Sequence, residues 1–270
     1  MLLAIDIGNT NTVLGLFNES GERVADWRLT THRTQTVDEY GVLFRNLFSL
    51  RGIEVAAVDA IIVSSVVPPI DSTVRKMCED YFGHCPLFVE PGIKTGISIR
   101  TDNPAEVGAD RIVNSVAAFH KYGGPCIVVD LGTATSFDVI SKQGEFLGGA
   151  IAPGLGIAAD ALFSRAARLM RVDIRRPEKV IGSNTIETLQ IGLYYGYLGL
   201  IDGILERMLK ELGAETRVVA TGGLAKLLAQ DSRFISTVDD WLTLEGLHLI
   251  YERNLPSQKR ARKEPTAKEV

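Results

Sequence analysis

The sequence predicts an α/β protein that contains two copies of one unit. In each copy a buried strand ends at an aspartate, Asp6 or Asp130, and a turn with Gly8 or Gly132 leads into a polar return strand. The two aspartates are about one domain length apart, whereas the repeats of a solenoid are much shorter. We therefore expect a boundary near residue 118, with domains over residues 1–117 and 118–255.

Composition indicates an ordinary globular protein. The chain has 270 residues, of which 46% are hydrophobic and 23% are charged, so it needs no disulfide or metal to complete a core. Its net charge of −4 argues against a general nucleic-acid binder. The three cysteines lack a CxxC spacing and are typical of buried thiols in a reducing compartment. Without a signal peptide or a long apolar span, we expect a soluble cytoplasmic protein with no membrane partner.

The first half begins with strands and continues with alternating helices and strands. Apolar runs and turn residues predict an antiparallel meander over residues 2–7, 12–17 and 24–29. Helical periodicity, a further buried run and a pair of prolines then predict a helix over 38–50, a strand over 60–67 and a helix over 70–82.

The second half repeats the opening and then becomes rich in helix. We expect strands over 126–130, 136–140 and 217–220, and a helix over 183–212. Asn184 is the expected N-cap of that helix, with Glu187 as its reciprocal partner. Residues 256–270 are polar and basic, which predicts a disordered, solvated tail with no nucleic-acid partner.

Four glycines of the long helix fall on one face at helical spacing. Because each glycine costs about 1 kcal/mol of helix propensity, we expect another backbone to pack closely there. The neighbour is either a helix of the same domain or a second subunit. The glycines are Gly192, Gly196, Gly199 and Gly203.

The two aspartate-tipped hairpins are candidates for phosphate binding. Turns of this kind offer backbone N–H groups and hydroxyls to phosphate oxygens, and a carboxylate at the strand end can hold Mg²⁺. Alone, the first turn could be an ordinary hairpin in which Gly8 and Asn11 adopt special backbone angles. The duplication favours a phosphate clamp with a nucleotide cleft between the two domains. The P-loop and dinucleotide-binding motifs are both missing from the sequence.

Two smaller motifs add candidates. The turn Thr221-Gly222-Gly223 follows a strand and allows close approach of a base or a phosphate. Residues 103–111 are expected to open a helix, with Asn103 as N-cap and Glu106 at its third position. Asp110 and Arg111 are then either a surface ion pair or a substrate site, where Gly108 leaves room for a ligand.

Taken together, the motifs resemble type III pantothenate kinase, of the acetate and sugar kinase/Hsp70/actin superfamily. They occur in family order and cover roughly residues 1–253. The matching segments are Asp6-Ile-Gly-Asn-Thr-Asn-Thr, Ser64-Ser-Val-Val-Pro68, Asn103-Pro-x-Glu-x-Gly-Ala-Asp-Arg111, Val129-Asp-Leu-Gly-Thr-Ala134, Gly148-Gly-x-Ile-x-Pro-Gly154 and Thr221-Gly-Gly223.

The resemblance implies two ribonuclease H-like domains, a cytoplasmic homodimer, and ATP-dependent phosphorylation of pantothenate, the first step of coenzyme A synthesis. It implies a proton acceptor at Asp110, a potassium or ammonium ion at Asp130, and Mg²⁺ with ATP. The implied ATP-binding residues are Asp6, Ile7, Gly8, Asn9, Thr10, Asn11, Thr12, Val13 and Thr133. The implied pantothenate-binding residues are Gly108, Ala109, Asp110, Arg111 and Thr185.

One position departs from the family pattern, and two other functions remain open. Family members often carry a tyrosine where this chain has Thr101, so Thr101 is left out of the site. A regulatory relative, similar to transcription accessory factors, is the first alternative, although a pure regulator has no need of both Asp110 and Asp130. The second is a superfamily kinase that acts on another small hydroxylated substrate.

Overall fold

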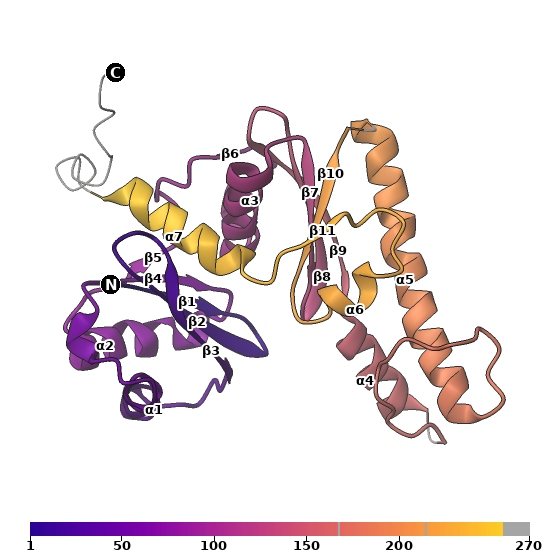
Figure 1. Ribbon diagram of the computed structural model, residues 1–270, viewed down its shortest axis with the longest axis horizontal. Coiled ribbons are helices and arrows are strands. Elements are labelled where there is room, and N and C mark those ends of the chain that lie inside the picture. The colour runs from indigo at the N-terminus through magenta and orange to yellow at the C-terminus, as the bar shows by residue number, and fades with distance from the viewer. Residues whose placement is uncertain (167, 214, 256–270) are drawn as a thin grey trace. The chain divides into compact units, whose positions relative to one another are not determined.

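The computed structural model describes residues 1–166, 168–213 and 215–255 and divides into two compact units (Figure 1). Of the described residues, the first unit comprises Met1–Gly96, Asn103–Ala117 and 243–255; the second comprises Ile97–Asp102 and Ala118–Leu242. One division falls between Ala117 and Ala118. The segment 97–102 belongs to the second unit, and the C-terminal helix from Thr243 belongs to the first. The predicted tail, residues 256–270, lies outside the described residues.

The first unit is built on a mixed sheet of five strands in the order β3-β2-β1-β4-β5. Three antiparallel strands form the expected meander, and β4 and β5 continue the sheet parallel to β1. The strands are β1 (Leu2–Ile7), β2 (Asn11–Phe17), β3 (Arg23–Thr30), β4 (Ala60–Ser65) and β5 (Leu87–Phe88).

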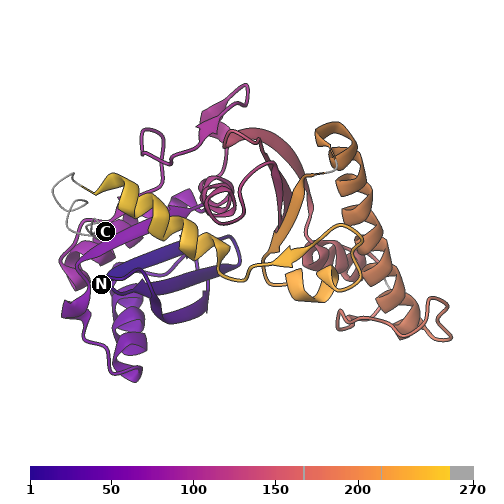
Figure 2. The ribbon, with the colours of Figure 1, turned by 45° about the horizontal axis from the view of Figure 1, so that its top comes forward.

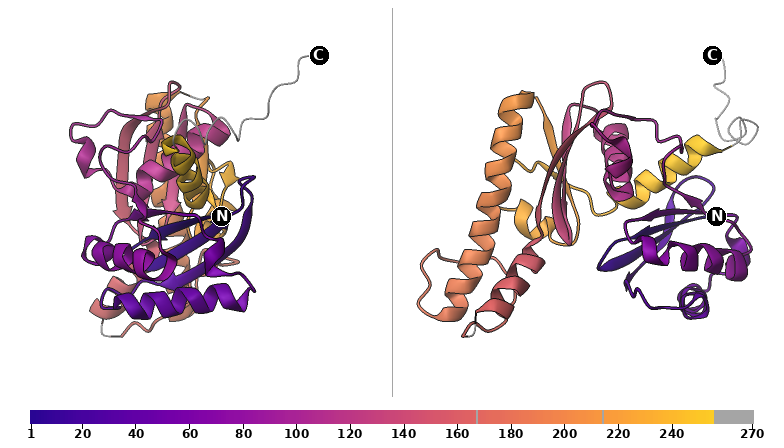
Figure 3. Two further views of the ribbon diagram at one scale, coloured as in Figure 1. Left: turned by 90° about the vertical axis from the view of Figure 1, so that its left-hand side faces the viewer. Right: turned by 180° about the vertical axis from the view of Figure 1, so that it is seen from behind.

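Helices cover both faces of this sheet. Figure 3 shows α1 (Val37–Leu50) and α2 (Asp71–Phe82) on one side and α7 (Leu242–Asn254) on the other. Side chains along β1 alternate between the two faces of the sheet. Those of Leu3, Ile5 and Ile7 point toward α1 and α2, where they belong to the hydrophobic core of the unit. Asp6 therefore faces the opposite side of the sheet.

Local sequence explains the ends of the two expected helices. Thr36 caps α1, and Glu39 completes a reciprocal capping box with it. Gly83 ends α2 in a left-handed conformation with φ 72°, which favours glycine. Short 3₁₀ turns connect other elements over Val55–Ala57, Pro68–Ile70 and Pro104–Glu106.

Two helices of the first unit cross with their backbones in close contact. These are α7, which the sequence analysis missed, and α3 (Ala109–Tyr122), of which residues 109–117 belong to this unit. A Cβ atom on Gly246 would collide with the carbonyl oxygen of Val113. Thr243 also donates a hydrogen bond to Asn114 Oδ1 at 2.7 Å. Figure 2 shows α7 lying across its sheet.

The second unit has a mixed sheet of six strands in the order β11-β10-β7-β8-β9-β6. Strands β7, β8 and β9 are antiparallel, whereas β10 and β11 continue parallel to β7, and the short β6 pairs with β9. The strands are β6 (Ser98–Ile99), β7 (Cys126–Leu131), β8 (Ala134–Ile140), β9 (Glu145–Pro153), β10 (Arg217–Thr221) and β11 (Thr237–Val238).

Five of the six strands in the second sheet, all but β6, repeat the first sheet strand for strand. β7, β8, β9, β10 and β11 take the places of β1, β2, β3, β4 and β5, with the same senses of pairing. Asp6 and Asp130 each occupy the fifth of six positions in their strands, and both strands have the same pattern of buried residues. The predicted α/β duplication is confirmed.

Three helices complete the second unit: α4 (Leu155–Arg165), α5 (Thr185–Leu212) and α6 (Ala225–Ala229). The core between α5 and the sheet includes Ile127, Tyr197 and Ile201. As Figure 1 shows, α4 and the N-terminal part of α5 extend beyond the end of the sheet. Among the described residues, no helix is long and apolar enough to cross a membrane.

The glycine face of α5 lies open. Within the described residues, no atom comes within 4 Å of a Cβ placed on Gly192, Gly196 or Gly199, and Gly203 meets only Arg207 of the same helix. The expectation that a helix of the same domain packs there finds no support in this part of the chain. A second subunit remains as the open alternative.

Two smaller expectations were confirmed only in part. Asn184 does cap α5, but the Glu187 carboxylate accepts hydrogen bonds from the N–H and hydroxyl of Ser183 rather than from Asn184 N–H. Cys78 and Cys126 are buried thiols, and burial raises the pKa of each to about 12. Cys85, in contrast, is exposed.

Candidate active site

The first predicted phosphate loop is a tight hairpin between β1 and β2. Gly8 N–H donates to Asn11 O at 2.9 Å, which leaves Asn9 and Thr10 exposed at the tip. Neither Gly8 nor Asn11 has a positive φ, so the special backbone angles considered for this turn are absent. A Cβ atom on Gly8 would instead lie 3.1 Å from the Asn11 carbonyl oxygen, which is a tight contact that glycine avoids.

The residues of this loop differ in what they can offer a ligand. Ile7 is 1% exposed and Thr12 is 2% exposed, so their side chains belong to the interior. The side chains of Asp6, Asn11 and Val13 are partly buried. Ligand contacts from the loop can therefore come from its backbone, from the exposed tip and from the Asp6 carboxylate.

The segment with the predicted base has a different local structure from the one expected. Pro104–Glu106 forms a 3₁₀ turn, and α3 begins only at Ala109, so Asp110 lies in the first helical turn rather than the second. Asn103 is not a side-chain cap; its amide donates to Glu106 Oε1 at 2.7 Å. The extended backbone of Val107 ends this turn and interrupts the helix that the capping pattern suggests.

Gly108 and Asp110 fit together in space. A Cβ atom on Gly108 would lie 2.7 Å from Asp110 Oδ1 and 3.6 Å from a methyl carbon of Val66. The space that the missing side chain leaves is thus filled by the carboxylate of Asp110, and not kept open for a ligand. Val66 belongs to the Ser64–Pro68 motif, so this motif lies beside Gly108 of the Asn103–Arg111 motif.

Burial dominates the electrostatics of Asp110. It raises the pKa of the carboxyl, because the ionised form loses hydration. The N–H of Arg111, which donates to Asp110 Oδ1 at 2.8 Å, and the Arg111 guanidinium both oppose this shift. A carboxylate with a raised pKa is suited to accept a proton near neutral pH.

Asp6 has a buried serine beside it that the sequence analysis did not select. Ser64 is the direct neighbour of Asp6 in the parallel β1–β4 pair, and both side chains point to the same face of the sheet. Ser64 is 0% exposed, and its hydroxyl has no hydrogen-bond partner within the described residues. Only the register of the two strands reveals this neighbour.

The second hairpin surrounds Asp130 with glycines. Cβ atoms on Gly132 and Gly222 would lie 3.3 Å and 2.6 Å from Asp130 Oδ1. Gly154 N–H donates to Thr133 O at 3.1 Å, and a Cβ on Gly154 would collide with that same oxygen. In the Thr221–Gly223 turn, Gly222 therefore packs against the Asp130 carboxylate at the end of β7. Gly223 faces open space.

Thr133 and Thr185, the other predicted residues of the second unit, are both exposed. Thr133 lies at the tip of the β7–β8 hairpin, whereas Thr185 lies in the first turn of α5. Among the residues that the structure describes, Thr185 has no hydrogen bond to Asp130 or to Thr133. Asp130 and Thr133 thus lie on one strand end and the hairpin that follows it, whereas Thr185 lies on a separate helix.

The oxygen ligands at the two hairpins suit hard cations better than a transition metal bound by several side chains. Over the described residues, no three His, Cys, Asp or Glu side chains gather into a metal site. The Asp130 carboxylate in its glycine cradle and the backbone carbonyls next to it are oxygen ligands. They fit a monovalent cation, and the Asp6 carboxylate fits Mg²⁺ carried by a nucleotide.

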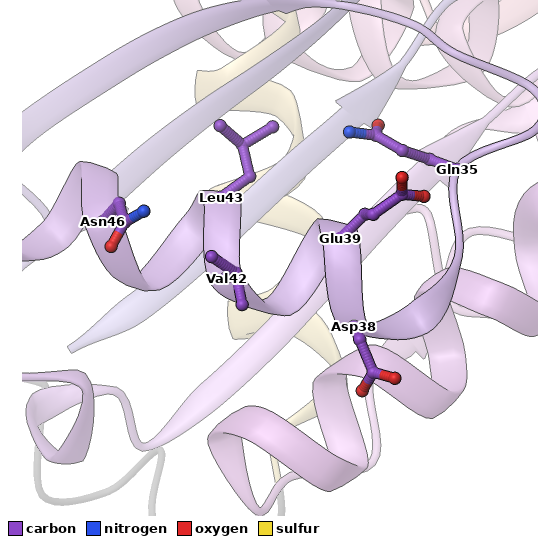
Figure 4. Close-up of a pocket in the computed structure, with 6 residues that line it drawn as sticks. All are labelled: Gln35, Asp38, Glu39, Val42, Leu43 and Asn46. Carbon is purple, nitrogen blue, oxygen red and sulfur yellow. The ribbon is translucent and has the colours of Figure 1, made fainter.

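A shallow depression elsewhere in the first unit contains none of the predicted site residues. It lies along α1 and the residues that precede it (Figure 4). Its lining consists of Gln35, Asp38, Glu39, Val42, Leu43 and Asn46.

Comparison with known proteins identifies the family. A family model for type III pantothenate kinase matches residues 2–207, which is more than half of the chain. The chain belongs to the type III pantothenate kinase family. A type III pantothenate kinase from Koribacter versatilis is 61% identical over 263 residues, covering 94% of this chain and 96% of the relative. A type III pantothenate kinase from Acidobacterium capsulatum is 53% identical, covering 97% of this chain and 98% of the relative.

Solved structures with low sequence identity share the fold. A candidate 2-dehydro-3-deoxygalactonokinase from Sinorhizobium meliloti superimposes with a TM-score of 0.59 at 13% identity, covering 95% of this chain and 97% of the other. The activator of 2-hydroxyisocaproyl-CoA dehydratase from Clostridium difficile superimposes with a TM-score of 0.52 at 13% identity, covering 100% of this chain and 99% of the other. The duplicated sheets of this pantothenate kinase family member are therefore those of ribonuclease H-like domains.

Proposed function

We propose that this chain transfers a phosphoryl group from ATP to pantothenate and forms 4'-phosphopantothenate, the first step of coenzyme A synthesis. Family membership over nearly the whole chain supports the activity. The observation that carries the catalytic assignment is the Asp110 carboxylate, which is partly buried and seated over Gly108.

Each unit contributes a different part of the proposed chemistry. In phosphoryl transfer most catalysis comes from positioning the reactants and stabilising charge on the phosphates. The first unit supplies the hairpin over residues 6–13, where the Asp6 carboxylate would hold the Mg²⁺ that ATP carries. The second unit supplies Thr133 for ATP. Bound Mg²⁺ neutralises charge that develops on the phosphates.

Asp110 is the proposed proton acceptor. It would accept the proton of the pantothenate hydroxyl as that oxygen attacks phosphorus, and its raised pKa suits this role. Arg111 would bind the pantothenate carboxylate, because a guanidinium pairs with a carboxylate through two parallel hydrogen bonds. Gly108 and Ala109 would line the substrate, and Thr185 would contact it from the start of α5.

A monovalent cation, potassium or ammonium, is the proposed occupant of the Asp130 cradle. The carboxylate seated among these glycines and the backbone carbonyl oxygens beside it are the kind of oxygen ligands that such an ion prefers. When bound, such an ion offsets negative charge near the phosphates. Asp130→Ala should abolish potassium activation, and equal wild-type turnover in sodium and potassium buffers would contradict the assignment.

A homodimer is the proposed assembly, with its interface on the second unit. The open glycine face of α5 supports it, as does a group of exposed large apolar side chains on neighbouring elements. These side chains are Leu147, Ile151, Ile157, Leu162 and Ile186. An exposed free thiol at Cys85 favours the cytoplasm as the compartment.

A coupled assay tests the proposed activity. ADP release should be followed with pantothenate and with a panel of other small hydroxy acids, each with and without potassium. We expect turnover with pantothenate that exceeds the rest of the panel, and stimulation by potassium. Preference for another hydroxy acid would favour a different superfamily kinase, and absence of turnover with any acceptor would favour a regulatory relative.

A further inference from the structure

A short segment between β3 and α1 is tied to the first hairpin by three hydrogen bonds in which one residue, Thr31, takes part. Thr31 N–H donates to Thr10 O at 2.9 Å, and Thr31 Oγ1 donates to Gly8 O at 2.7 Å. The Thr31 and Thr12 hydroxyl oxygens are 2.9 Å apart in the interior. Thr31 is 9% exposed, so these bonds are sheltered from water. It therefore fixes both sides of the turn that carries Asn9.

His32, the next residue, is anchored to the core through its backbone carbonyl. The Tyr40 hydroxyl donates to His32 O at 3.1 Å, and Tyr40 is 2% exposed. Its ring packs edge-on against Phe44 with the ring centroids 6.0 Å apart. The segment is thus held at Thr31 by the hairpin and at His32 by α1. These contacts fix the backbone position from which the Arg33 side chain extends.

Arg33 reaches back to the tip of the hairpin. Its Nη2 donates to Asn9 Oδ1 at 2.8 Å, and the residue is exposed. Asn9 is neutral, and no carboxylate pairs with Arg33 among the described residues. A guanidinium has five N–H donors, of which this contact uses one. The hairpin tip therefore presents a positive charge with free donors.

We propose that Arg33 binds the polyphosphate of the nucleotide, and that Thr31 is the positioning residue that holds Arg33 and the hairpin in register. The proposal rests on the proposed function, because it takes residues 6–13 as the ATP phosphate loop. A guanidinium matches phosphate oxygens with two parallel hydrogen bonds. Residues 6–13 contain no lysine or arginine, so Arg33 is the cationic side chain that the Asn9 contact places at this hairpin.

Nucleotide titration of the full-length protein tests Arg33. Arg33→Ala, Arg33→Lys and the wild type should be titrated calorimetrically with MgATP, MgADP and AMP. A charge-assisted hydrogen bond predicts that Arg33→Ala weakens MgATP and MgADP binding about 10- to 100-fold, with a smaller effect on AMP. Arg33→Lys should be intermediate, since an ammonium makes no bidentate pair. The matched control is Arg51→Ala, an exposed arginine just after α1.

The possible outcomes distinguish this proposal from a role of Arg33 in binding pantothenate and from a failure of the proposed function. Affinity for MgATP in Arg33→Ala equal to that in Arg51→Ala would overturn it, and so would an equal loss for AMP. A raised KM for pantothenate with unchanged nucleotide affinity would assign Arg33 to the substrate carboxylate instead. A wild type that binds MgATP but does not phosphorylate pantothenate would remove the proposed function and leave the nucleotide titrations valid.

A pair of variants tests the role of Thr31. Thr31→Val keeps the shape and removes the hydroxyl, so the KM for MgATP should rise while circular dichroism stays unchanged. Thr31→Ser keeps the hydroxyl and should restore a KM near the wild-type value. A purely structural role predicts a lower melting temperature with an unchanged KM for MgATP in Thr31→Val, and that result would contradict the assignment.

Discussion

At the scale of single residues, the Asp110 carboxylate occupies the space that a side chain on Gly108 would need. The spacing in the sequence suggested that Gly108 makes room for a ligand, but the glycine makes room for the base. Sequence patterns could select both residues. They could not show which group fills the gap, because that depends on where the first turn of α3 begins.

The pH dependence of catalysis should report Asp110. The base must be ionised to accept a proton, and burial raises its pKa. Turnover should therefore fall as the pH drops through that raised pKa, at a higher pH than for an ordinary aspartate near 3.9. Asp110→Asn should lower kcat by about 10²- to 10⁴-fold and remove this acid limb, while MgATP affinity is unchanged. Near-normal turnover in Asp110→Asn would show that the base lies elsewhere.

Gly108→Ala should separate catalysis from nucleotide binding. The added methyl would lie 2.7 Å from Asp110 Oδ1 and must displace the carboxylate. Because a shift of about 1 Å at a reacting group can cost roughly 10²-fold, we expect kcat to fall by about that factor. Calorimetry with MgATP is the control and should match the wild type. Unchanged kcat would mean that the carboxylate need not occupy this position.

At the scale of elements, close backbone contact joins α7 to the helix that carries Asp110. Gly246 lies against the Val113 carbonyl of α3, and a carbonyl cannot move aside as a side chain can. The contact brings a C-terminal helix to a segment more than a hundred residues earlier. Helical periodicity alone gives no information about such a partner.

Gly246→Ala should therefore destabilise the protein. Overpacking costs about 1–3 kcal/mol, which exceeds the gain of roughly 1 kcal/mol in helix propensity. Thermal unfolding should show a lower melting temperature for Gly246→Ala. Gly156→Ala, in α4, meets no atom within 4 Å and should match or exceed the wild type. The same melting temperature in both variants would argue against the backbone contact.

At the scale of the whole molecule, the open glycine face of α5 bears on the assembly. Gly196→Leu adds a bulky side chain where no atom of the described chain lies within 4 Å. If a second subunit packs there, sedimentation should show a weakened dimer. Ser49→Leu, on the exposed face of α1, is the control for a new surface leucine. An unchanged dimer in Gly196→Leu would place the interface elsewhere.

The elements with strong local signals could be predicted from the sequence. The strand Leu2–Ile7, the long helix up to Leu212 and the two aspartate-tipped hairpins follow from apolar periodicity and turn residues, which are properties of neighbouring positions. Capping was only partly predictable: Asn184 was found, whereas the start of α3 was misplaced by the pattern at Asn103.

By itself, the sequence determined the duplicated α/β architecture, the aspartates at the strand ends and the family. Only the tertiary structure decided which segments meet: strands of two residues such as β5 and β11, the place of α7 in the first unit, and the contact of Arg33 with Asn9. The physical reason is that periodicity and turn chemistry act between near neighbours, whereas these features depend on contacts between residues far apart in the chain. A two-residue strand has too little local preference to form alone, and the sheet beside it supplies the missing free energy.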